Sequence, residues 1–202
     1  MIEQVKGTQN IAGEDSLKYL YIQNQFLNKF GDHGYKYLQT PLLEYKELFD
    51  KSIGESSEIV TKQMYELTDK GGRDLVLRPE GTSGVVRAFL NAGLTQDIPK
   101  RYSYYGPMFR YERPQKGRLR QFKQFGIECI GINNSMADVE VISLGHAFLE
   151  KLKILDKINL KINTLGDSET RLRYREALVC LLYTSDAADE GLGVDLGGRR
   201  II

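Results

Sequence analysis

The chain has 202 residues, is 41% hydrophobic and 27% charged, and carries a formal net charge of +1, which is typical of one globular domain or of one domain with an incomplete second part. Its two cysteines, Cys129 and Cys180, give neither a disulfide framework nor metal-ligand spacing, so we expect no structural metal site. The N-terminus lacks the apolar core of a signal peptide and no apolar run is long enough to span a membrane, which favours a cytoplasmic protein with no membrane partner.

Residues 14–41 predict a helix followed by a strand. Apolar side chains recur at helical spacing over residues 14–30, and Gly31 and Gly34 are suitable stop signals for that helix. The β-prone run over residues 35–41 predicts a strand, and Pro41 would end its pairing or place it at a sheet edge.

A hairpin and a second helix are expected next. In the stretch MYELTDKGGRDLVLRPEGT, residues 64–82, two β-prone runs flank residues 69–72, which supply turn conformations. After this hairpin, Thr82 or Ser83 would cap a helix that runs to Gly93.

The second half of the chain predicts a longer hairpin, two helices and one more strand. The expected elements are a strand over residues 102–113, a loop over 114–119, a return strand over 120–131, a helix over about 137–152, an alternating strand over 158–166 and a last helix from about Ser168. The two hairpins and the helices beside them are consistent with an α+β fold.

The end of the chain has a different character. From residue 179 onward the sequence shows no clear period and resembles translated sequencing-adapter read-through, with a flexible natural tail as the alternative. We therefore expect two parts: a folded part over residues 1–178, and a tail over residues 179–202 that is non-native, either disordered or artefactual.

The second hairpin concentrates positive charge. Residues 104–126, YYGPMFRYERPQKGRLRQFKQFG, hold six Arg or Lys and one carboxylate in a nearly neutral chain. Strand alternation predicts that each strand has one side with charge and a glycine: Gly106, Met108, Arg110 and Glu112 on the first strand, and Phe122, Gln124, Gly126 and Glu128 on the return strand. Such a side combines charge with a glycine, so a ligand can approach it closely, although a solvated sheet face also alternates.

Arg110 has two interpretations on these residues alone. Its planar fork matches phosphate oxygens, so it would stabilise charge on a reacting phosphorus while the bases of residues 113–120 grip other phosphates. Alternatively, Arg110 pairs with Glu112 or Glu128, and the loop bases only solvate the hairpin tip.

Glu80 also has two interpretations. It lies between Pro79 and Gly81 at a strand-to-helix junction, where unpaired backbone N–H groups favour anions. It either caps the helix by accepting those N–H groups or binds an ammonium group with help from the Thr82 hydroxyl.

These motifs together resemble one family. GPMFRYERPQKGRLRQFKQFGIE is similar to motif 2 of class II aminoacyl-tRNA synthetases, in the form found in histidyl-tRNA synthetases. KGTQN, GYKYLQTPLLE (similar to motif 1), MYELTDKGGRDLVLRPEGT and NTLGDSETRLRYREAL extend the resemblance in order over roughly residues 2–178. The fold that it implies is a class II synthetase-like antiparallel sheet flanked by helices, here truncated.

The resemblance implies a role for each matching residue. Arg110 would be the catalytic residue, in contact with the α-phosphate of ATP. The residues implied to bind ATP are Arg110, Glu112, Arg118 and Leu119. The residues implied to bind histidine are Glu80, Gly81, Thr82, Arg110, Gln124 and Glu128, of which Glu128 would accept a hydrogen bond from the imidazole. Arg113 and Gln115 would face the tRNA acceptor end.

The implied activity is that of a histidine–tRNA ligase. ATP, with Mg²⁺ to offset the triphosphate charge, would activate L-histidine to histidyl-adenylate, and the histidyl group would pass to the 3′ end of tRNA(His). Such a reaction depends on positioning and charge stabilisation. Because motif 1 forms the dimer interface in the family, the complete protein is expected to be a homodimer.

The sequence also departs from the family pattern. It has no second histidine-binding segment, no glycine-rich motif 3 and no anticodon-binding domain, so we expect this chain alone not to charge tRNA. One alternative is a synthetase-like regulatory subunit of ATP phosphoribosyltransferase, against which the intact RPQKGRLRQF loop argues. A second is a nucleic-acid-binding module without chemistry, which leaves Glu80, Gln124 and Glu128 unexplained.

Overall fold

The computed structural model divides the chain into two compact units, Met1–Ile158 and Asn159–Ile202. The residues that it describes are 2–54, 57–163, 166–184, 194–195 and 199–200. All the residues predicted for the site belong to the first unit. None of the helices in the described part is long and apolar enough to cross a membrane.

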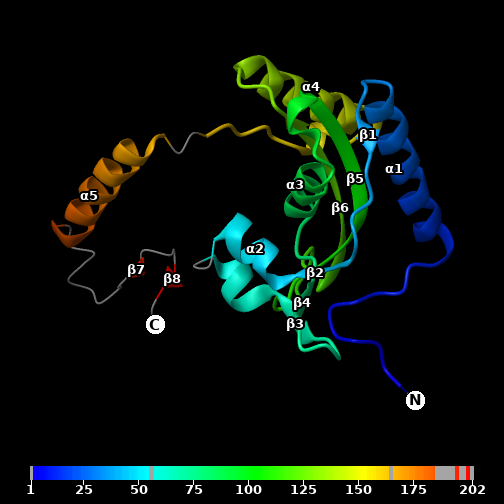
Figure 1. Cartoon of the computed structure of the whole chain (residues 1–202), viewed down its shortest axis with the longest axis horizontal. Coiled ribbons are helices and arrows are strands. Elements are labelled where there is room, and N and C mark those ends of the chain that lie inside the picture. The colour runs from blue at the N-terminus through cyan, green and yellow to red at the C-terminus, as the bar shows by residue number, and fades with distance from the viewer. Residues whose placement is uncertain (1, 55–56, 164–165, 185–193, 196–198, 201–202) are drawn as a thin grey trace. The chain divides into compact units, whose positions relative to one another are not determined.

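A long hairpin forms the centre of the first unit (Figure 1). Its strands are β5 (Lys100–Phe109) and β6 (Gln121–Ile130), which pair antiparallel with Tyr104 opposite Gly126. The two-residue strand β1 (Lys36–Tyr37) adds a parallel edge to β5. The predicted hairpin and the predicted edge strand are therefore confirmed.

The bounds of two predicted strands were wrong. β5 starts at residue 100 and ends at residue 109, because Tyr111 N donates to Gln63 O over 2.7 Å and takes the chain away from β6. The strand over residues 35–41 shrinks to β1, because the carbonyls of Thr40 and Pro41 accept the Arg78 guanidinium instead of a strand partner.

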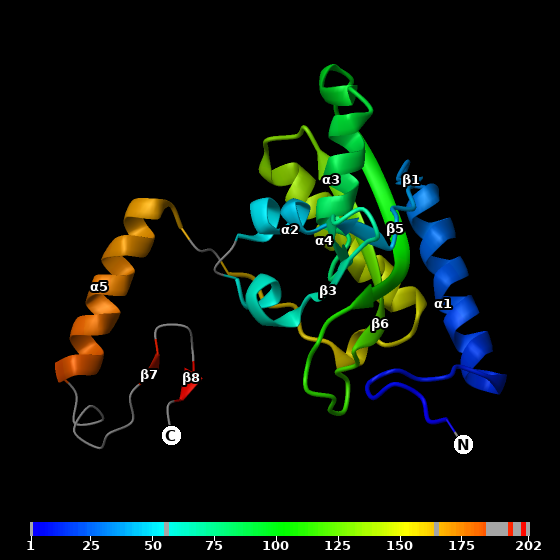
Figure 2. The same cartoon turned by 60° about the horizontal axis from the view of Figure 1, so that its bottom comes forward.

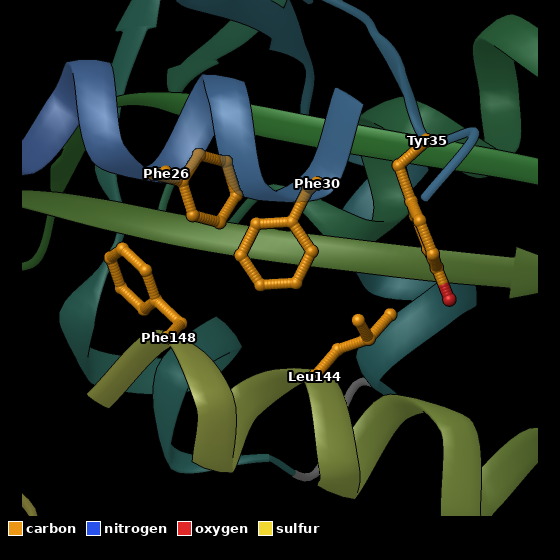
Figure 3. Packing of buried hydrophobic residues seen from close by; sticks show 5 residues of the cluster. All are labelled: Phe26, Phe30, Tyr35, Leu144 and Phe148. Carbon is orange, nitrogen blue, oxygen red and sulfur yellow. The ribbon is translucent and has the colours of Figure 1, made fainter. Parts of the chain in front are cut away.

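Two helices cover one face of the hairpin. They are α1 (Gly13–Gly31) and α4 (Ser135–Lys151), both within a few residues of their predicted bounds. Figure 3 shows Phe26 and Phe30 of α1 facing Leu144 and Phe148 of α4. Phe125 and Ile127 of β6 pack against this cluster, which confirms the predicted apolar face of the return strand. Burying each such side chain contributes about 1.5–3 kcal/mol. This face of the hairpin is therefore occupied by the core, and the opposite face is the one available for a site.

A smaller sheet and a third helix belong to the same unit (Figure 2). The strands β2 (Leu43–Tyr45), β3 (Tyr65–Thr68) and β4 (Asp74–Leu77) form the antiparallel order β2-β4-β3, which confirms the predicted hairpin. Next in the chain, α3 (Thr82–Asn91) packs Val85 against Tyr104 and Met108 of β5. The start of α3 therefore lies beside the face of β5 and β6 that bears Gln124 and Glu128.

Several elements were not predicted from the sequence. They are α2 (Lys46–Ile53), the π-helical turn η1 (Ile59–Gln63) and the 3-10 turns η2 (Leu94–Gln96) and η3 (Leu155–Lys157). The strand predicted over residues 158–166 was wrong for the part that is described: residues 158–163 and 166 form no strand. Its alternating Ile158, Leu160 and Ile162 are exposed, and a strand needs a neighbour to accept its backbone hydrogen bonds.

The second unit contains the last predicted helix. α5 (Ser168–Thr184) begins at the predicted residue, where Asp167 Oδ1 accepts the backbone N–H of Thr170 over 2.7 Å. The helix continues past residue 179, where the tail was expected to begin. Within that tail, β7 (Val194–Asp195) and β8 (Arg199–Arg200) are described, and residues 185–193, 196–198 and 201–202 lie outside the described part. The non-native origin of the tail stays a prediction.

Candidate active site

Glu80 caps the N-terminus of α3. Its carboxylate accepts hydrogen bonds from Thr82 N over 2.5 Å and from Ser83 N over 2.9 Å. The predicted cap by the Thr82 or Ser83 side chain was wrong: neither hydroxyl accepts a backbone N–H of α3, and that of Ser83 is hydrogen-bonded with Ser52 Oγ over 2.7 Å. The capping interpretation of Glu80 thus holds in the structure, and the Thr82 hydroxyl is released for another partner.

That partner is Glu128 of β6. Thr82 Oγ1 donates to Glu128 Oε1 over 2.7 Å, which connects the start of α3 to β6. Burial raises the pKa of Glu128, the hydrogen bonds from Thr82 and Tyr104 lower it in part, and the negative charge of Glu80 raises it further. Among the described residues no cationic side chain forms an ion pair with Glu128. A ligand that donates an N–H would therefore satisfy this carboxylate.

Gln124 lies four residues before Glu128 on the same face of β6. Its Oε1 atom is buried and has no hydrogen-bond partner in the described part of the chain. Buried polar atoms are rarely left without a partner, so this acceptor also fits a ligand that donates a hydrogen bond.

Gly81 has no room for a side chain, because Tyr104 packs against it. A Cβ atom on Gly81 would lie 2.2 Å from Cε2 of Tyr104, which is closer than any side chain tolerates. The structure thus gives Gly81 a packing reason beside the binding role that the sequence implied.

Arg110 follows directly after β5. Its Nε donates to the carbonyl oxygen of Pro79 over 2.9 Å, and its guanidinium lies 5.1 Å from the centroid of the Phe122 ring. Arg110 pairs with neither Glu112 nor Glu128, so the ion-pair interpretation was wrong. Its remaining donors are available to an anion.

An open cavity of about 750 Å³ lies over the connection between β5 and β6. Its lining comprises Gln9, Glu58, Gln63, Arg110, Glu112, Gln115, Lys116, Gly117, Arg118, Leu119, Phe122 and Lys123. The cavity brings together all four residues predicted to bind ATP, and its volume suits a nucleotide-sized ligand. Of the two residues predicted to face tRNA, it includes Gln115 and not Arg113, which is exposed.

Within the cavity, charges are partly paired. Glu112 and Arg118 face each other with 3.5 Å between Oε2 and Nη1. The backbone on this side is held by the N-terminal segment, because the Gly7 carbonyl oxygen accepts Arg120 N over 2.7 Å. Glu112 and Arg118, both predicted to bind ATP, thus contact each other across the loop.

Several residues of this site were not predicted from the sequence. Gln9, Gln63 and Lys123 line the cavity, and Tyr104 contacts the histidine-site candidates. Gln9 and Gln63 arrive from distant segments without a local signal. Tyr104 had one, because strand alternation from Gly106 and Arg110 places it on the same face.

The fold is that of the class II aminoacyl-tRNA synthetases: an antiparallel hairpin between helices, here with an arginine at the strand end beside a basic cavity. Residues 7–173 match the sequence profile of the family described as histidyl-tRNA synthetase. The chain belongs to that family.

Three comparisons show the extent of the similarity. A histidine–tRNA ligase of Streptococcus suis is 45% identical over 181 residues, which cover 88% of this chain and 42% of the relative. The crystal structure of apo histidyl-tRNA synthetase from S. aureus has a TM-score of 0.62 at 37% identity and covers 75% of this chain and 40% of that one. The third is the crystal structure of an ATP phosphoribosyltransferase regulatory subunit/histidyl-tRNA synthetase from Bacillus halodurans. It has a TM-score of 0.64 at 30% identity, and the match covers 75% of this chain and 38% of the Bacillus chain. The chain thus spans less than half the length of the relatives it matches.

Proposed function

We propose that this chain is the first part of the catalytic core of a histidine–tRNA ligase. The observation that carries the proposal is the adjacency of two sites. The Thr82–Glu128 hydrogen bond and the unpartnered Gln124 form a small polar site, and Arg110 lies in a basic cavity of nucleotide size. Pro79 connects them, because its carbonyl holds Arg110 while the next residue caps α3.

The small site would hold L-histidine. Glu128 would accept an imidazole N–H, and the orphaned Oε1 of Gln124 would accept a second donor of the amino acid. Glu80, with Gly81 and Thr82, would lie near the α-amino group, whose positive charge offsets the two carboxylates. An isostere without a ring N–H would leave Glu128 unpaired, which makes the site selective.

The larger cavity would hold ATP. Arg110 would contact the α-phosphate and stabilise the charge that develops when the histidine carboxylate attacks the phosphorus, with pyrophosphate leaving. Glu112, Arg118 and Leu119 would position the nucleotide at the cavity wall.

Mg²⁺ would arrive with the triphosphate. The described residues hold no cluster of three or more His, Cys, Asp or Glu side chains that suits a metal ion. Mg²⁺ commonly takes one or two carboxylates plus substrate phosphates, and Glu58 and Glu112 are the carboxylates in the cavity lining. The residues present therefore fit a magnesium ion held mainly by ATP.

The loop between β5 and β6 would meet the acceptor end of tRNA(His). Arg113 and Gln115 are exposed there, and Arg113 lies outside the nucleotide cavity. The transfer of the histidyl group and the homodimer expected from motif 1 belong to the complete protein. The alternative of a regulatory subunit gives this loop no polyanion to bind.

A chimaera tests the proposal. Residues 7–173 would replace the corresponding segment of the Streptococcus suis ligase, to which the chain is 45% identical. We expect histidine-dependent ATP–pyrophosphate exchange and tRNA charging, and a loss of about 10²–10³-fold in exchange on Arg110→Ala. A chimaera that melts like the parent enzyme yet shows no histidine-dependent exchange would overturn the proposal and favour the regulatory-subunit alternative, whereas exchange without charging would contradict the role given to the loop at the tRNA acceptor end.

A further inference from the structure

Tyr104 occupies a slot made by two glycines from different elements. It lies opposite Gly126 in the β5–β6 ladder, and its side chain is 5% exposed. A Cβ atom on Gly126 would lie 2.1 Å from Cζ of Tyr104, and one on Gly81 would lie 2.2 Å from its Cε2. The ring is therefore fixed from both sides, and even one methyl group on either side would displace it.

Packing alone does not explain the tyrosine hydroxyl. A phenylalanine would fill the same slot, and a buried hydroxyl costs free energy unless it finds a partner. The Tyr104 ring lies against Gly81 and so beside Thr82, and a hydrogen bond from Tyr104 is one of the causes that lower the pKa of Glu128. Since the single proton of the Thr82 hydroxyl is already directed at Glu128 Oε1, the Tyr104 hydroxyl keeps its own proton for the same carboxylate.

We propose that Tyr104 is a positioning residue that, together with Thr82, fixes the orientation of the Glu128 carboxylate and keeps it ionised for ligand binding. The consequence for histidine rests on the proposed function, whereas the contacts among the three side chains do not. Two hydroxyl donors from two elements, β5 and α3, would hold the carboxylate before any ligand arrives.

The electrostatics around Tyr104 agree with this role. Burial is the main reason that the pKa of Tyr104 rises to about 12, so the hydroxyl keeps its proton throughout the neutral range. The charged groups that face it are Glu128 of β6, Glu80 before α3 and Arg78 after β4. Burial and Glu80 both favour the protonated form of Glu128, and the two hydroxyl donors oppose them.

The decisive experiment follows the carboxyl group directly. The ¹³C carboxyl resonance of Glu128 is titrated in the 202-residue chain, in its Tyr104→Phe variant and in a Tyr35→Phe control. Tyr35 is an equally buried tyrosine whose hydroxyl donates to Glu140 over 3.0 Å. Removing a donor raises the pKa of the carboxylate it served. Tyr104→Phe should therefore move the titration of Glu128 to higher pH, and Tyr35→Phe should move that of Glu140 instead.

A second measurement links the titration to histidine. In the chimaera, Tyr104→Phe should raise the KM for histidine about tenfold, more strongly at low pH, and leave the KM for ATP unchanged. An unmoved Glu128 titration in a Tyr104→Phe variant that melts cooperatively overturns the inference. An unaltered pH profile for histidine overturns it as well, provided that the parent chimaera is active. If the titration moves but the parent chimaera shows no histidine-dependent exchange, the proposed function fails and the link between Tyr104 and Glu128 stands.

Discussion

Arg110 Nε donates to the carbonyl oxygen of Pro79 across 2.9 Å, which ties the end of β5 to the residue immediately before Glu80. The ring of Phe122 supports the same guanidinium at 5.1 Å. Neither Nη atom forms a hydrogen bond with the described residues. The arginine is thus oriented by the protein through one nitrogen and offers the other two to a ligand.

We expect Arg110→Lys to lower the rate of histidine-dependent ATP–pyrophosphate exchange by about 10²–10³-fold. A lysine keeps the charge but has no second nitrogen to bond Pro79 while it contacts phosphate. The rate is measured in the chimaera beside Arg73→Lys, a control at the exposed β3–β4 turn, where Arg73 pairs with Asp69. Equal losses in both variants would contradict the role given to Arg110.

Glu128→Ala should abolish histidine recognition and leave the fold largely intact. Among the described residues the carboxylate has only hydroxyl partners, so its removal costs little in folding but deletes the acceptor for the imidazole. We expect the KM for histidine to rise at least tenfold, the KM for ATP to stay constant and the melting temperature to change little. Glu66→Ala is the control, because Glu66 pairs only with Lys46 at the surface. Unchanged histidine affinity in the Glu128 variant would refute the assignment.

Local signals predicted the helices and the hairpins well. The period of α1 and the glycine-rich turn between β3 and β4 depend on residues close in sequence, and both were predictable. The strand expected over residues 158–166 failed among its described residues, because alternation indicates a face but does not supply a neighbouring strand. β1 was overestimated for a similar reason, since Arg78 takes the carbonyls that would have extended it.

The site was predictable in part. Alternation alone placed Gln124 and Glu128 on one side of β6, and the register adds that Gly106 lies opposite Gln124, which brings together the two sides that bear a glycine. The sequence left open whether Glu80 caps the helix or binds a ligand. The positions of the Thr82 and Ser83 N–H groups in the structure show the cap. Gln9 reaches the cavity only because Gly7 docks on the backbone of Arg120, a contact between segments more than a hundred residues apart.

Glu140 should make stability depend on acid pH. Arg101 donates to it through Nε over 2.7 Å and through Nη2 over 2.8 Å, and mainly for this reason the pKa of Glu140 falls to about 2. A carboxyl group whose pKa is lower in the folded state stabilises the fold at neutral pH. That contribution is lost as the pH falls from about 5 towards 2.

The measurement is urea unfolding of the chain and of Glu140→Gln between pH 7 and pH 3. Since Glu140 is one-third exposed, we expect the variant to be less stable by about 1 kcal/mol at pH 7, with a gap that narrows at pH 3. The stability of Glu66→Gln, which removes an exposed partner of Lys46, should change with pH in parallel with that of the wild type. A gap that stays constant for Glu140→Gln would show that its pKa is not lowered by folding.

Substitutions at the left-handed residues that follow α1 and α4 should change the stability of the protein in opposite directions. Gly34 has φ 78° and Lys153 has φ 58°, and in each case the next residue donates to a carbonyl five residues back: Tyr35 N to Phe30 O over 3.0 Å, and Ile154 N to Leu149 O over 3.3 Å. Left-handed backbone suits glycine and strains other residues. Lys153→Gly should therefore raise the free energy of unfolding by about 0.5–1 kcal/mol, and Gly34→Ala should lower it by about 1 kcal/mol. A Cβ on Gly34 meets no atom within 4 Å, so the loss of stability would come from the backbone conformation alone. The free energies of unfolding are measured by urea unfolding of both variants. Changes of the same sign in the two variants would contradict this explanation.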